Sequence, residues 1–392
     1  MNSILILQVL ASVVGGLGLF LLGMKYLSDG LQTIAGSRLR SMLALVTNNS
    51  FSAVIVGALV TAIIQSSSAT TVMVVGFVNS AFLTLTQAIG VIMGANIGTT
   101  VTAWILVLPI CKYGLPILGL AALGYRFGKN ERFRDTCMTL MGLGMVFFGL
   151  SLMKQGFAPI KEMPDFVAWF SYFDASSGYF GVLKCAIAGC LLTMIVQSSS
   201  ATIGITIGLA YTGVIPFETA AALVLGENIG TTITTLLASI GTTINAKRAA
   251  YAHMLFNIIG VLWVTALFVY YYKLVLWILP ADPTAAKAVN SETVYPNVTA
   301  GIAIVHSVFN IANVILFLPF VKYMARFLER VAPDKPYKET PKITQLDIRH
   351  VETPSLAIEQ SYHEIVRMMD HAAKMEGYLL NCVNGAKKRD KS

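Results

Sequence analysis

The sequence predicts an all-α polytopic membrane protein with two inverted-topology repeats, each containing a re-entrant helical hairpin and a broken transmembrane helix. Two observations predict this fold. The chain has 392 residues, of which 55% are hydrophobic and only 12% are charged, whereas a soluble domain carries roughly a quarter charged residues. In addition, the block Gln65–Thr71 returns 132 residues later as Gln197–Ile203.

Each copy of this glutamine–serine block is followed by a second shared block. Asn96–Thr100 and Asn228–Thr232 both read Asn-Ile-Gly-Thr-Thr, and both begin 31 residues after their glutamine. Two motifs repeated at the same spacing indicate a duplication, with transmembrane repeat 1 in residues 1–128 and repeat 2, plus extra C-terminal helices, in residues 129–331. Ser, Thr, Gly and Asn also serve ordinary packing between membrane helices, but a duplicated pair of motifs favours a functional site.

Apolar segments long enough to cross a membrane recur along the chain, since a span needs about 20 apolar residues. We expect spans at 4–27, 87–109, 112–127, 135–153, 217–243, 249–279 and 297–321. Two further apolar stretches, 51–80 and 179–214, carry the serine blocks at their centres. Each of these is either one long span or a re-entrant hairpin of two half-helices that turns at the serines.

The basic residues favour the hairpin. If both stretches leave the membrane on the side they entered, and the N-terminus is outside, every basic cluster is cytoplasmic, as the positive-inside rule requires. The clusters are Arg38 and Arg40; Arg126, Lys129, Arg132 and Arg134; Lys247 and Arg248; and Lys322, Arg326 and Arg330. Three crossings then separate the repeats, so the second is inverted. We expect a multi-pass protein of the cell (inner) membrane with a cytoplasmic C-terminus.

The serine blocks offer hydrogen-bond donors suited to an oxyanion. A hairpin tip supplies hydroxyls, and the half-helix after it supplies N–H groups at the positive end of its dipole. Inverted repeats with broken helices place a substrate site near the midplane between them. The candidate substrate residues are Gln65, Ser66, Ser67, Ser68, Gln197, Ser198, Ser199 and Ser200. No Lys or Arg lies near either block in the sequence apart from Lys184, thirteen residues before Gln197.

The Asn-Ile-Gly-Thr-Thr blocks suit a hard cation. Four glycines, Gly94, Gly98, Gly226 and Gly230, allow unwound segments in the spans 87–109 and 217–243, and free carbonyls with Asn and Thr oxygens suit Na⁺. The candidate sodium ligands are Gln65, Asn96, Thr99, Thr100, Gln197, Asn228, Thr231 and Thr232. They would hold sodium next to the oxyanion, where opposite charges stabilise each other.

Three further polar residues lie in apolar segments. Glu227 stands where the first repeat has Ala95, and an intramembrane carboxylate is a functional candidate. Glu227 is therefore a candidate coupling residue for a cation or a proton, with a structural hydrogen bond as the alternative. His253 and His306 each precede an asparagine by four residues, so each pair shares a helix face. We expect polar clasps between helices rather than a proton relay.

The chain lacks the sequence signs of an enzyme. No His/Asp arrangement accompanies the serines, and no Gly-rich phosphate loop follows a strand. The net charge of +8 lies in short loops and the tail, which is typical of membrane orientation and not of nucleic-acid binding. The partners we expect are the lipid bilayer and a small oxyanion.

These motifs resemble the type II sodium-dependent phosphate cotransporter family, whose hallmark is a duplicated Gln-Ser-Ser-Ser motif followed by a Gly-Ala/Ser-Asn-Ile-Gly-Thr block. Here they stand as Gln65–Ser68 with Gly94–Thr99 and as Gln197–Ser200 with Gly226–Thr231. The resemblance covers about residues 1–330. It implies sodium-driven symport of inorganic phosphate by alternating access, with phosphate between the hairpin tips and sodium ions as the coupling ions. Glu227 departs from the family pattern, in which small residues are usual.

The composition changes after Val331. Residues 332–355 are rich in Pro and charge and read as a linker, and residues 356–392 read as a cytoplasmic amphipathic helix. This helix resembles the opening helix of the PhoU-type domain that many bacterial members carry. We expect a truncated domain, a helix that docks on a partner (a second copy or a cytoplasmic regulatory protein), or a solvated tail.

The sequence is compatible with three functions. The first is the sodium:phosphate symporter. The second keeps transport but changes the substrate to another oxyanion or the coupling ion to a proton carried by Glu227. The third is a phosphate-sensing regulatory membrane component, which would bind phosphate without moving it.

Overall fold

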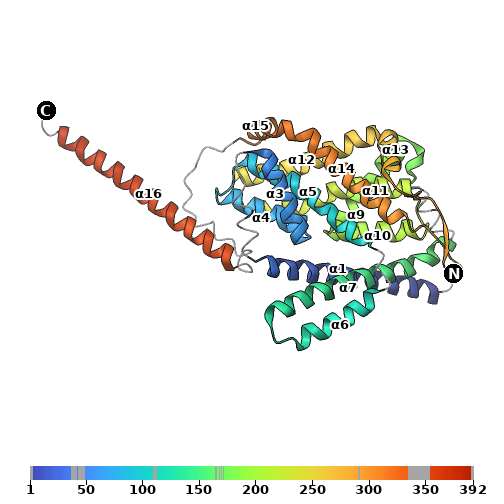
Figure 1. Ribbon diagram of the computed structural model, residues 1–392. Helices are drawn as coiled ribbons and strands as arrows, with labels where there is room; N and C mark the ends of the chain where they lie inside the picture. Colours follow the sequence, from blue (N-terminus) through green and yellow to red (C-terminus); the bar gives the residue numbers. More distant parts are fainter. Residues whose placement is uncertain are drawn as a thin grey trace. The chain divides into compact units, whose positions relative to one another are not determined.

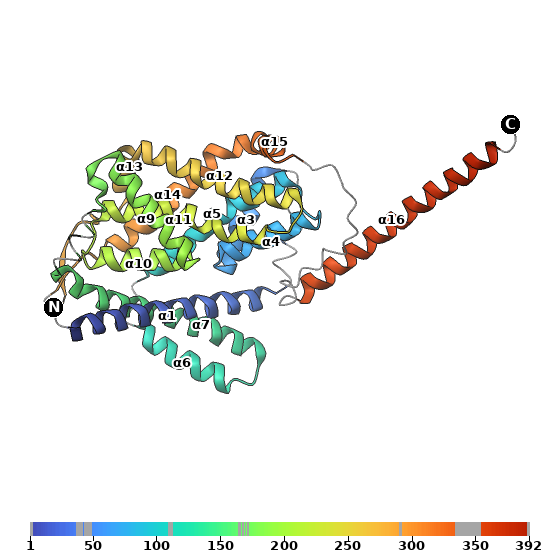
Figure 2. The same cartoon turned by 180° about the vertical axis from the view of Figure 1, so that it is seen from behind.

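The computed structural model describes residues 3–36, 42, 49–108, 113–163, 166, 168, 170, 172–289, 292–333 and 354–389. These residues are almost wholly helical (Figures 1 and 2). Seven of the described helices are long and apolar enough to cross a membrane, so the prediction of an all-α polytopic membrane protein is confirmed. The cluster Arg38 and Arg40 and most of the predicted linker lie outside the described residues.

The chain divides into two compact units, residues 1–79 with 83–333 and residues 80–82 with 334–392. The helices of the first unit are α1 (Ser3–Ala35), α3 (Ser50–Ile64), α4 (Ser67–Asn79), α5 (Leu85–Val107), α6 (Gly114–Phe127), α7 (Glu131–Phe157), α9 (Tyr179–Val196), α10 (Ser199–Tyr211), α11 (Phe217–Ala238), α12 (Ile244–Ala266), α13 (Phe268–Ile278), α14 (Val298–Phe317) and α15 (Val321–Val331). Short 3₁₀ turns lie at Ala158–Glu162, Ala175–Ser177 and Leu318–Phe320. The strands β1 (Lys287–Val289) and β2 (Glu292–Val294) form an antiparallel pair.

The second unit contains α16 (Pro354–Arg389), which begins two residues before the predicted helix. Its large apolar side chains, among them Ile358, Ile365, Met368 and Met375, are exposed. An amphipathic helix is therefore present, while its docking on a partner stays a prediction.

Both stretches that carry a serine block are broken at the glutamine itself. Gln65 has φ 57° and ψ 25°, and Gln197 has φ 55° and ψ 23°, so both residues are left-handed and end the preceding helix. This conformation costs an ordinary L-residue roughly 1–2 kcal/mol. The equivalent glutamine, in the same strained conformation, thus ends α3 in the first half and α9 in the second.

The chain folds back after the first break. The Thr61 hydroxyl in α3 donates to the Thr70 hydroxyl in α4 across 3.0 Å, although nine residues of continuous helix would rise by about 13.5 Å. Helices α3 and α4 are therefore a helical hairpin, and α9 and α10 also pack on each other. Their re-entry into one face of a membrane stays a prediction.

The prediction that the Asn-Ile-Gly-Thr-Thr blocks are unwound is wrong. Helices α5 and α11 run through both blocks without a break. The glycines instead allow close helix packing: a Cβ on Gly94 would overlap the carbonyl oxygen of Val54, and one on Gly226 would overlap that of Ala186. Gly94 and Gly226 lie 132 residues apart, as do Val54 and Ala186, so the same contact joins α3 to α5 and α9 to α11.

Helices α1 and α7 pack through a reciprocal pair of glycine contacts. A Cβ on Gly16 would lie 2.8 Å from the Gly149 carbonyl oxygen, and one on Gly23 would lie 2.8 Å from that of Gly142. Gly142 lies 126 residues after Gly16, and Gly149 lies 126 residues after Gly23. The two contacts are therefore equivalent: each joins one member of the first glycine pair to the opposite member of the second. Figure 1 shows α1 and α7 side by side, with α6 beyond α7.

The predicted span 249–279 is two helices instead of one. Helix α12 ends at Ala266 and α13 begins at Phe268. The N–H of Leu267 at the junction donates to the carbonyls of Trp263 and Val264, 3.1 Å away in each case. The last turn of α12 is therefore tightened, and the non-helical φ of −105° and ψ of 21° at Leu267 separate the two helices. Composition alone gave no sign of this break because both sides are apolar.

Candidate functional site

The two serine blocks line one cavity of about 340 Å³, which we call the serine cavity. Its walls come from the break between α3 and α4, the break between α9 and α10, and one face of α1. The lining residues are Leu21, Met24, Lys25, Ser28, Asp29, Gln32, Gln65, Ser66, Ser67, Ser68, Ala69, Gln197, Ser198, Ser199 and Ser200. All eight predicted substrate residues are thus brought together, although they lie up to 135 positions apart in the sequence.

The first serine of each block caps the helix that follows. The Ser66 hydroxyl accepts from the Ala69 N–H across 3.1 Å, and the Ser198 hydroxyl accepts from the Ala201 N–H across 3.3 Å. The first turn of a helix leaves N–H groups without helical acceptors and carries partial positive charge. Both α4 and α10 begin at this cavity, so two positive helix ends line it along with the serine hydroxyls.

The side chain of Gln65 is hydrogen-bonded on both sides of the first break. The Gln65 side-chain amide donates to the Ala62 carbonyl, and its oxygen accepts from the Thr102 hydroxyl of α5 across 3.0 Å. The backbone N–H groups of Gln65 and Gln197 each donate to a threonine carbonyl, Thr61 and Thr193, across 2.7 Å. Gln65 therefore ties the first hairpin tip to α5 as well as facing the cavity.

The first hairpin is hydrogen-bonded to the second half of the chain. The Thr234 hydroxyl of α11 donates to the Ser68 hydroxyl across 3.2 Å, and the Thr71 and Thr235 hydroxyls lie 2.8 Å apart. Thr235 in turn lies 3.0 Å from Nδ1 of His253 in α12. These bonds connect α4, α11 and α12 beside the serine cavity.

The predicted sodium ligands on α5 and α11 are buried but lie outside the lining of the serine cavity. Their side chains bond within their own helices: the hydroxyls of Thr99, Thr100, Thr231 and Thr232 donate to carbonyls three or four residues earlier, as do the amides of Asn96 and Asn228. Each threonine oxygen keeps a lone pair that could coordinate a cation. Because α5 and α11 are unbroken, the groups available to sodium on these helices are side-chain oxygens and not free backbone carbonyls.

The buried carboxyl of Glu227 points at the second hairpin. One of its oxygens, Oε1, accepts from the Thr206 hydroxyl of α10 across 2.8 Å. The other, Oε2, has no hydrogen-bond partner among the described residues, and the side chain is 2% exposed. An unpaired buried acceptor is costly, which makes Glu227 a place where a proton or a cation would be stabilised.

One of the two histidine and asparagine pairs joins neighbouring helices as a pair, as predicted. His306 Nε2 and Asn310 Nδ2 of α14 both reach the Asn228 side-chain oxygen of α11, at 3.3 and 3.2 Å. In the other pair only the histidine reaches a neighbouring helix: His253 of α12 contacts Thr235 of α11, whereas Asn257 donates to the His253 carbonyl of its own helix. The Asn228 oxygen is therefore already occupied by protein donors in this conformation.

Sequence reasoning missed the contribution of α1. Four polar residues of this helix, Lys25, Ser28, Asp29 and Gln32, line the serine cavity. In the sequence no Lys or Arg except Lys184 lies near a serine block, but the fold brings Lys25 to the cavity that both blocks line. Their spacing in the sequence does place these four residues of α1 on one face of a helix. They follow a long apolar run, however, and in the sequence they look like its polar end.

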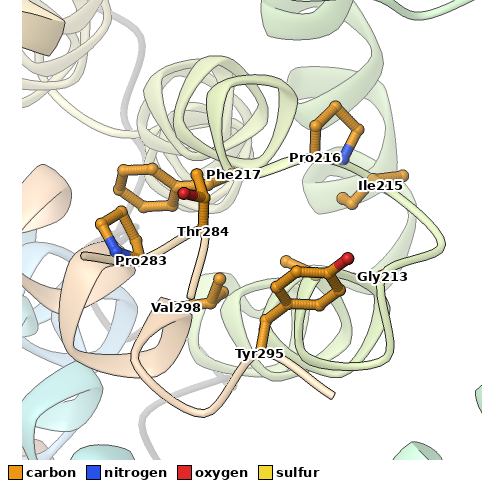
Figure 3. A pocket seen from close by; sticks show the side chains of 9 residues that line it. Gly213, Ile215, Pro216, Phe217, Pro283, Thr284, Tyr295 and Val298 are labelled. Atoms are coloured by element: carbon orange, nitrogen blue, oxygen red, sulfur yellow. The ribbon is translucent and has the colours of Figure 1, made fainter. Parts of the chain in front are cut away.

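A second cavity of about 340 Å³ is lined by the turn between α10 and α11, by Pro283 and Thr284 before β1, and by Tyr295 after β2 (Figure 3). The residues around it are mainly apolar, and Phe217 and Tyr295 supply two aromatic rings. The exposed carboxylate of Asp282 accepts from the hydroxyl and N–H of the lining residue Thr284, and these bonds lower the pKa of Asp282 below its ordinary value. Among the described residues, its lining includes no cationic side chain and neither serine block, so this lining offers an oxyanion fewer donors than the serine cavity does.

Comparison with known proteins identifies the family. The Na⁺/Pi-cotransporter family model matches residues 19–155 and 180–276, more than half of the chain and including both serine blocks. YqeW of Bacillus subtilis is 31% identical over 318 residues, which cover 81% of this chain and 96% of that protein. YjbB of Salmonella typhimurium, named for inorganic phosphate export, is 27% identical over 384 residues, 98% of this chain and 67% of that protein.

A human relative matches over a shorter segment, and no solved structure matches the chain. The human sodium-dependent phosphate transport protein 2B is 37% identical over 98 residues, which cover 24% of this chain and 14% of that protein. The family match, the relatives and the apolar helices agree on a multi-pass membrane transport protein that is not an enzyme. The chain belongs to the Na⁺/Pi-cotransporter family.

Proposed function

We propose that this protein is a secondary active transporter that moves inorganic phosphate by sodium-coupled symport and alternating access. The observation that carries the proposal is the serine cavity, where both Gln-Ser-Ser-Ser blocks and both following helix N-termini line one volume of about 340 Å³. Membership of the Na⁺/Pi-cotransporter family supports phosphate as the substrate and sodium as the coupling ion.

The binding chemistry follows from the lining groups. Phosphate oxygens would accept hydrogen bonds from the hydroxyls of Ser67, Ser68, Ser199 and Ser200 and from the first-turn N–H groups of α4 and α10. Hydrogen bonds to charged acceptors are about twice as strong as neutral ones. Ser66 and Ser198 would help indirectly, because their hydroxyls already cap these helices.

Sodium would bind beside the phosphate and offset its charge. The proposed ligands are the side-chain oxygens of Gln65, Gln197, Asn96, Thr99, Thr100, Asn228, Thr231 and Thr232. Because the Asn228 oxygen accepts from His306 and Asn310 in this structure, it would have to exchange these donors for sodium. Such an exchange would link ion binding to the contact between α11 and α14.

Alternating access would come from rocking one inverted repeat, residues 1–128, against the other, residues 129–331. Both hairpins would be re-entrant elements in the cell inner membrane, with the N-terminus outside and α16 in the cytoplasm. Helix α16 would dock on a cytoplasmic regulatory partner or a second copy through its exposed apolar side chains.

The direct test is uptake of radiolabelled phosphate by proteoliposomes that contain the purified full chain. An inward sodium gradient should drive phosphate accumulation, and replacing sodium by potassium should abolish it. Uptake that is indifferent to sodium would refute the coupling, and phosphate binding without any flux would instead support the regulatory function. Competition by arsenate or sulfate measures selectivity among oxyanions.

Proton coupling through Glu227 is a second candidate, favoured by the unpaired Oε2 atom of this buried side chain. Replacing Glu227 by Gln keeps the side chain's shape and an oxygen for the Thr206 hydroxyl. If a proton on Glu227 drives transport, Glu227→Gln flattens the pH dependence of uptake. If sodium alone drives it, the pH profile matches that of the wild type.

The direction of net transport is a separate question, since YjbB carries a name that refers to export. A sodium-coupled symporter moves phosphate down the sodium gradient from either side. Reversing the gradient in preloaded proteoliposomes should therefore reverse the phosphate flux, and phosphate efflux that ignores the sodium gradient would favour an exporter with another driving force.

A further inference from the structure

The third wall of the serine cavity is one face of α1. Its residues Leu21, Met24, Lys25, Ser28, Asp29 and Gln32 line the cavity together with the two serine blocks. The opposite face of α1 holds the glycines that pack on α7: Gly23 and Gly30 precede Lys25 and Gln32 by two residues each, which is a rotation of about 200° around the helix. Because the glycine face of α1 packs on α7, the opposite face of α1 is turned toward the serine cavity.

Hydrogen bonds hold this face of α1 against the first hairpin. The Ser28 hydroxyl donates to the carbonyl of Ile64, the residue before the left-handed Gln65, across 2.7 Å. Gln32 Nε2 then donates to the Ser28 hydroxyl across 3.0 Å. The bond from Ser28 satisfies a carbonyl at the C-terminal end of α3, so the position of α1 is coupled to the position of the hairpin tip.

Two opposite charges stand on this face. Lys25 is exposed and Asp29 is half-buried, and both line the serine cavity. They lie four residues apart, yet no ion pair within 4.0 Å joins either of them to another described residue. Lysine before an acidic residue is also the less favourable order for a pair within a helix. Both charges are thus available to ions in the cavity.

We propose that Lys25 binds the oxyanion in the serine cavity and that Asp29 binds the cation that accompanies it. This inference rests on the proposed function and adds the charged groups that the serine blocks lack. Lys25 supplies a mobile ammonium with three donors, which can follow phosphate between protonation states. Asp29 supplies a carboxylate, the ligand type that hard cations prefer, one helical turn from Lys25.

The competing arrangement is a water-bridged Lys25–Asp29 pair that only shapes the wall of the cavity. The two arrangements differ in what each single substitution changes. A structural pair predicts the same effect from neutralising either residue. Separate ion sites predict that Lys25 controls phosphate affinity and that Asp29 controls sodium dependence.

The test measures equilibrium binding of radiolabelled phosphate to the purified full chain, with sodium varied. Lys25→Gln should weaken phosphate binding by about tenfold or more, since a charge-assisted bond is lost, and Lys25→Arg should restore most of this affinity. Asp29→Asn should raise the sodium concentration needed for half-maximal phosphate binding by about tenfold. Lys322→Gln in α15 changes the same charge outside the cavity and should bind phosphate as the wild type does.

The outcomes separate this inference from the proposed function. If the wild type binds phosphate and Lys25→Gln binds it within about twofold of the wild type, the assignment of Lys25 is wrong while the proposed function stands. Equal effects of Lys25→Gln and Asp29→Asn on both ions would favour the structural pair and overturn the assignment. If the wild type itself does not bind phosphate, the proposed function falls and this assignment with it. Gel filtration and thermal melting in detergent confirm that each variant is folded.

Discussion

The hydroxyl of Thr71 lies 2.8 Å from the hydroxyl of Thr235 and joins the first serine hairpin to the long helix α11 of the second half. The equivalent positions, displaced by 132 residues, are Ile203 and Ala103, and neither side chain can form a hydrogen bond. The contact of α4 with α11 is therefore polar where the matching contact of α10 with α5 is apolar. This difference distinguishes two halves that share the same motifs.

Replacing Thr71 by Val should weaken phosphate uptake because it removes this contact. Thr71 also donates to the Ser68 carbonyl across 3.2 Å, so the substitution loosens a residue of the serine cavity. We expect a loss of stability of about 1 kcal/mol, since side-chain hydrogen bonds in membrane proteins average roughly 0.6 kcal/mol and reach about 1.7, and a higher KM for phosphate. Thr71→Ser keeps the hydroxyl and serves as the control. A wild-type KM in Thr71→Val would show that the contact does not position the cavity.

Replacing Gly226 by Ala should prevent stable folding. The new Cβ would overlap the Ala186 carbonyl oxygen, which is backbone and has little room to move. Forced overpacking of this kind costs about 1–3 kcal/mol or more. The yield and thermal stability of a fluorescent fusion in detergent measure the effect. Gly119→Ala in α6, where a Cβ would meet nothing within 4 Å, is the control and should be as stable as the wild type, so a stable Gly226→Ala protein would contradict the packing.

Substitutions of Gln197 should separate backbone geometry from side-chain chemistry. Its φ of 55° is a conformation that glycine adopts freely and a β-branched residue strongly resists. Gln197→Gly should therefore fold and lose transport, because the amide that lines the cavity is gone. Gln197→Val should fold poorly. Melting temperature and phosphate uptake provide the two readouts, and a Gln197→Val protein as stable as Gln197→Gly would show that the left-handed break is not required.

Single cysteines introduced into a cysteine-free background should report the proposed orientation. A cysteine at Lys129, between α6 and α7, should react with a membrane-impermeant maleimide only after the cytoplasmic side is exposed. A cysteine at Thr284, in the loop before β1, should react in intact cells. Labelling of both positions from the same side would contradict the odd number of crossings between them and therefore the re-entrant hairpins.

The sequence predicted the break in each hairpin to within a residue or two, because a run of polar residues at the centre of an apolar stretch is unfavourable in an unbroken helix that faces lipid. It did not predict that Gln65 and Gln197 themselves take the left-handed conformation, since glutamine has no marked preference for it. The error at the Asn-Ile-Gly-Thr-Thr blocks has a physical cause: glycine allows both unwinding and close packing, and only the neighbouring helix shows that Gly94 and Gly226 serve packing.

The charged residues of α1 were missed for a different reason. Lys25 and Asp29 belong to a helix whose other face packs on α7 through glycines. Their approach to the serine blocks is a tertiary contact between segments about 40 and 170 residues apart. Periodicity identifies a helix face, but it does not identify the partner that this face meets. The three-dimensional arrangement was needed to bring these residues into the site.

A map of the full chain determined with bound phosphate is the most direct test of the central claim, that both serine blocks bind one substrate. We expect phosphate density in the serine cavity within hydrogen-bonding distance of both Ser66–Ser68 and Ser198–Ser200. Density at only one block, or at a site away from both, would contradict the claim.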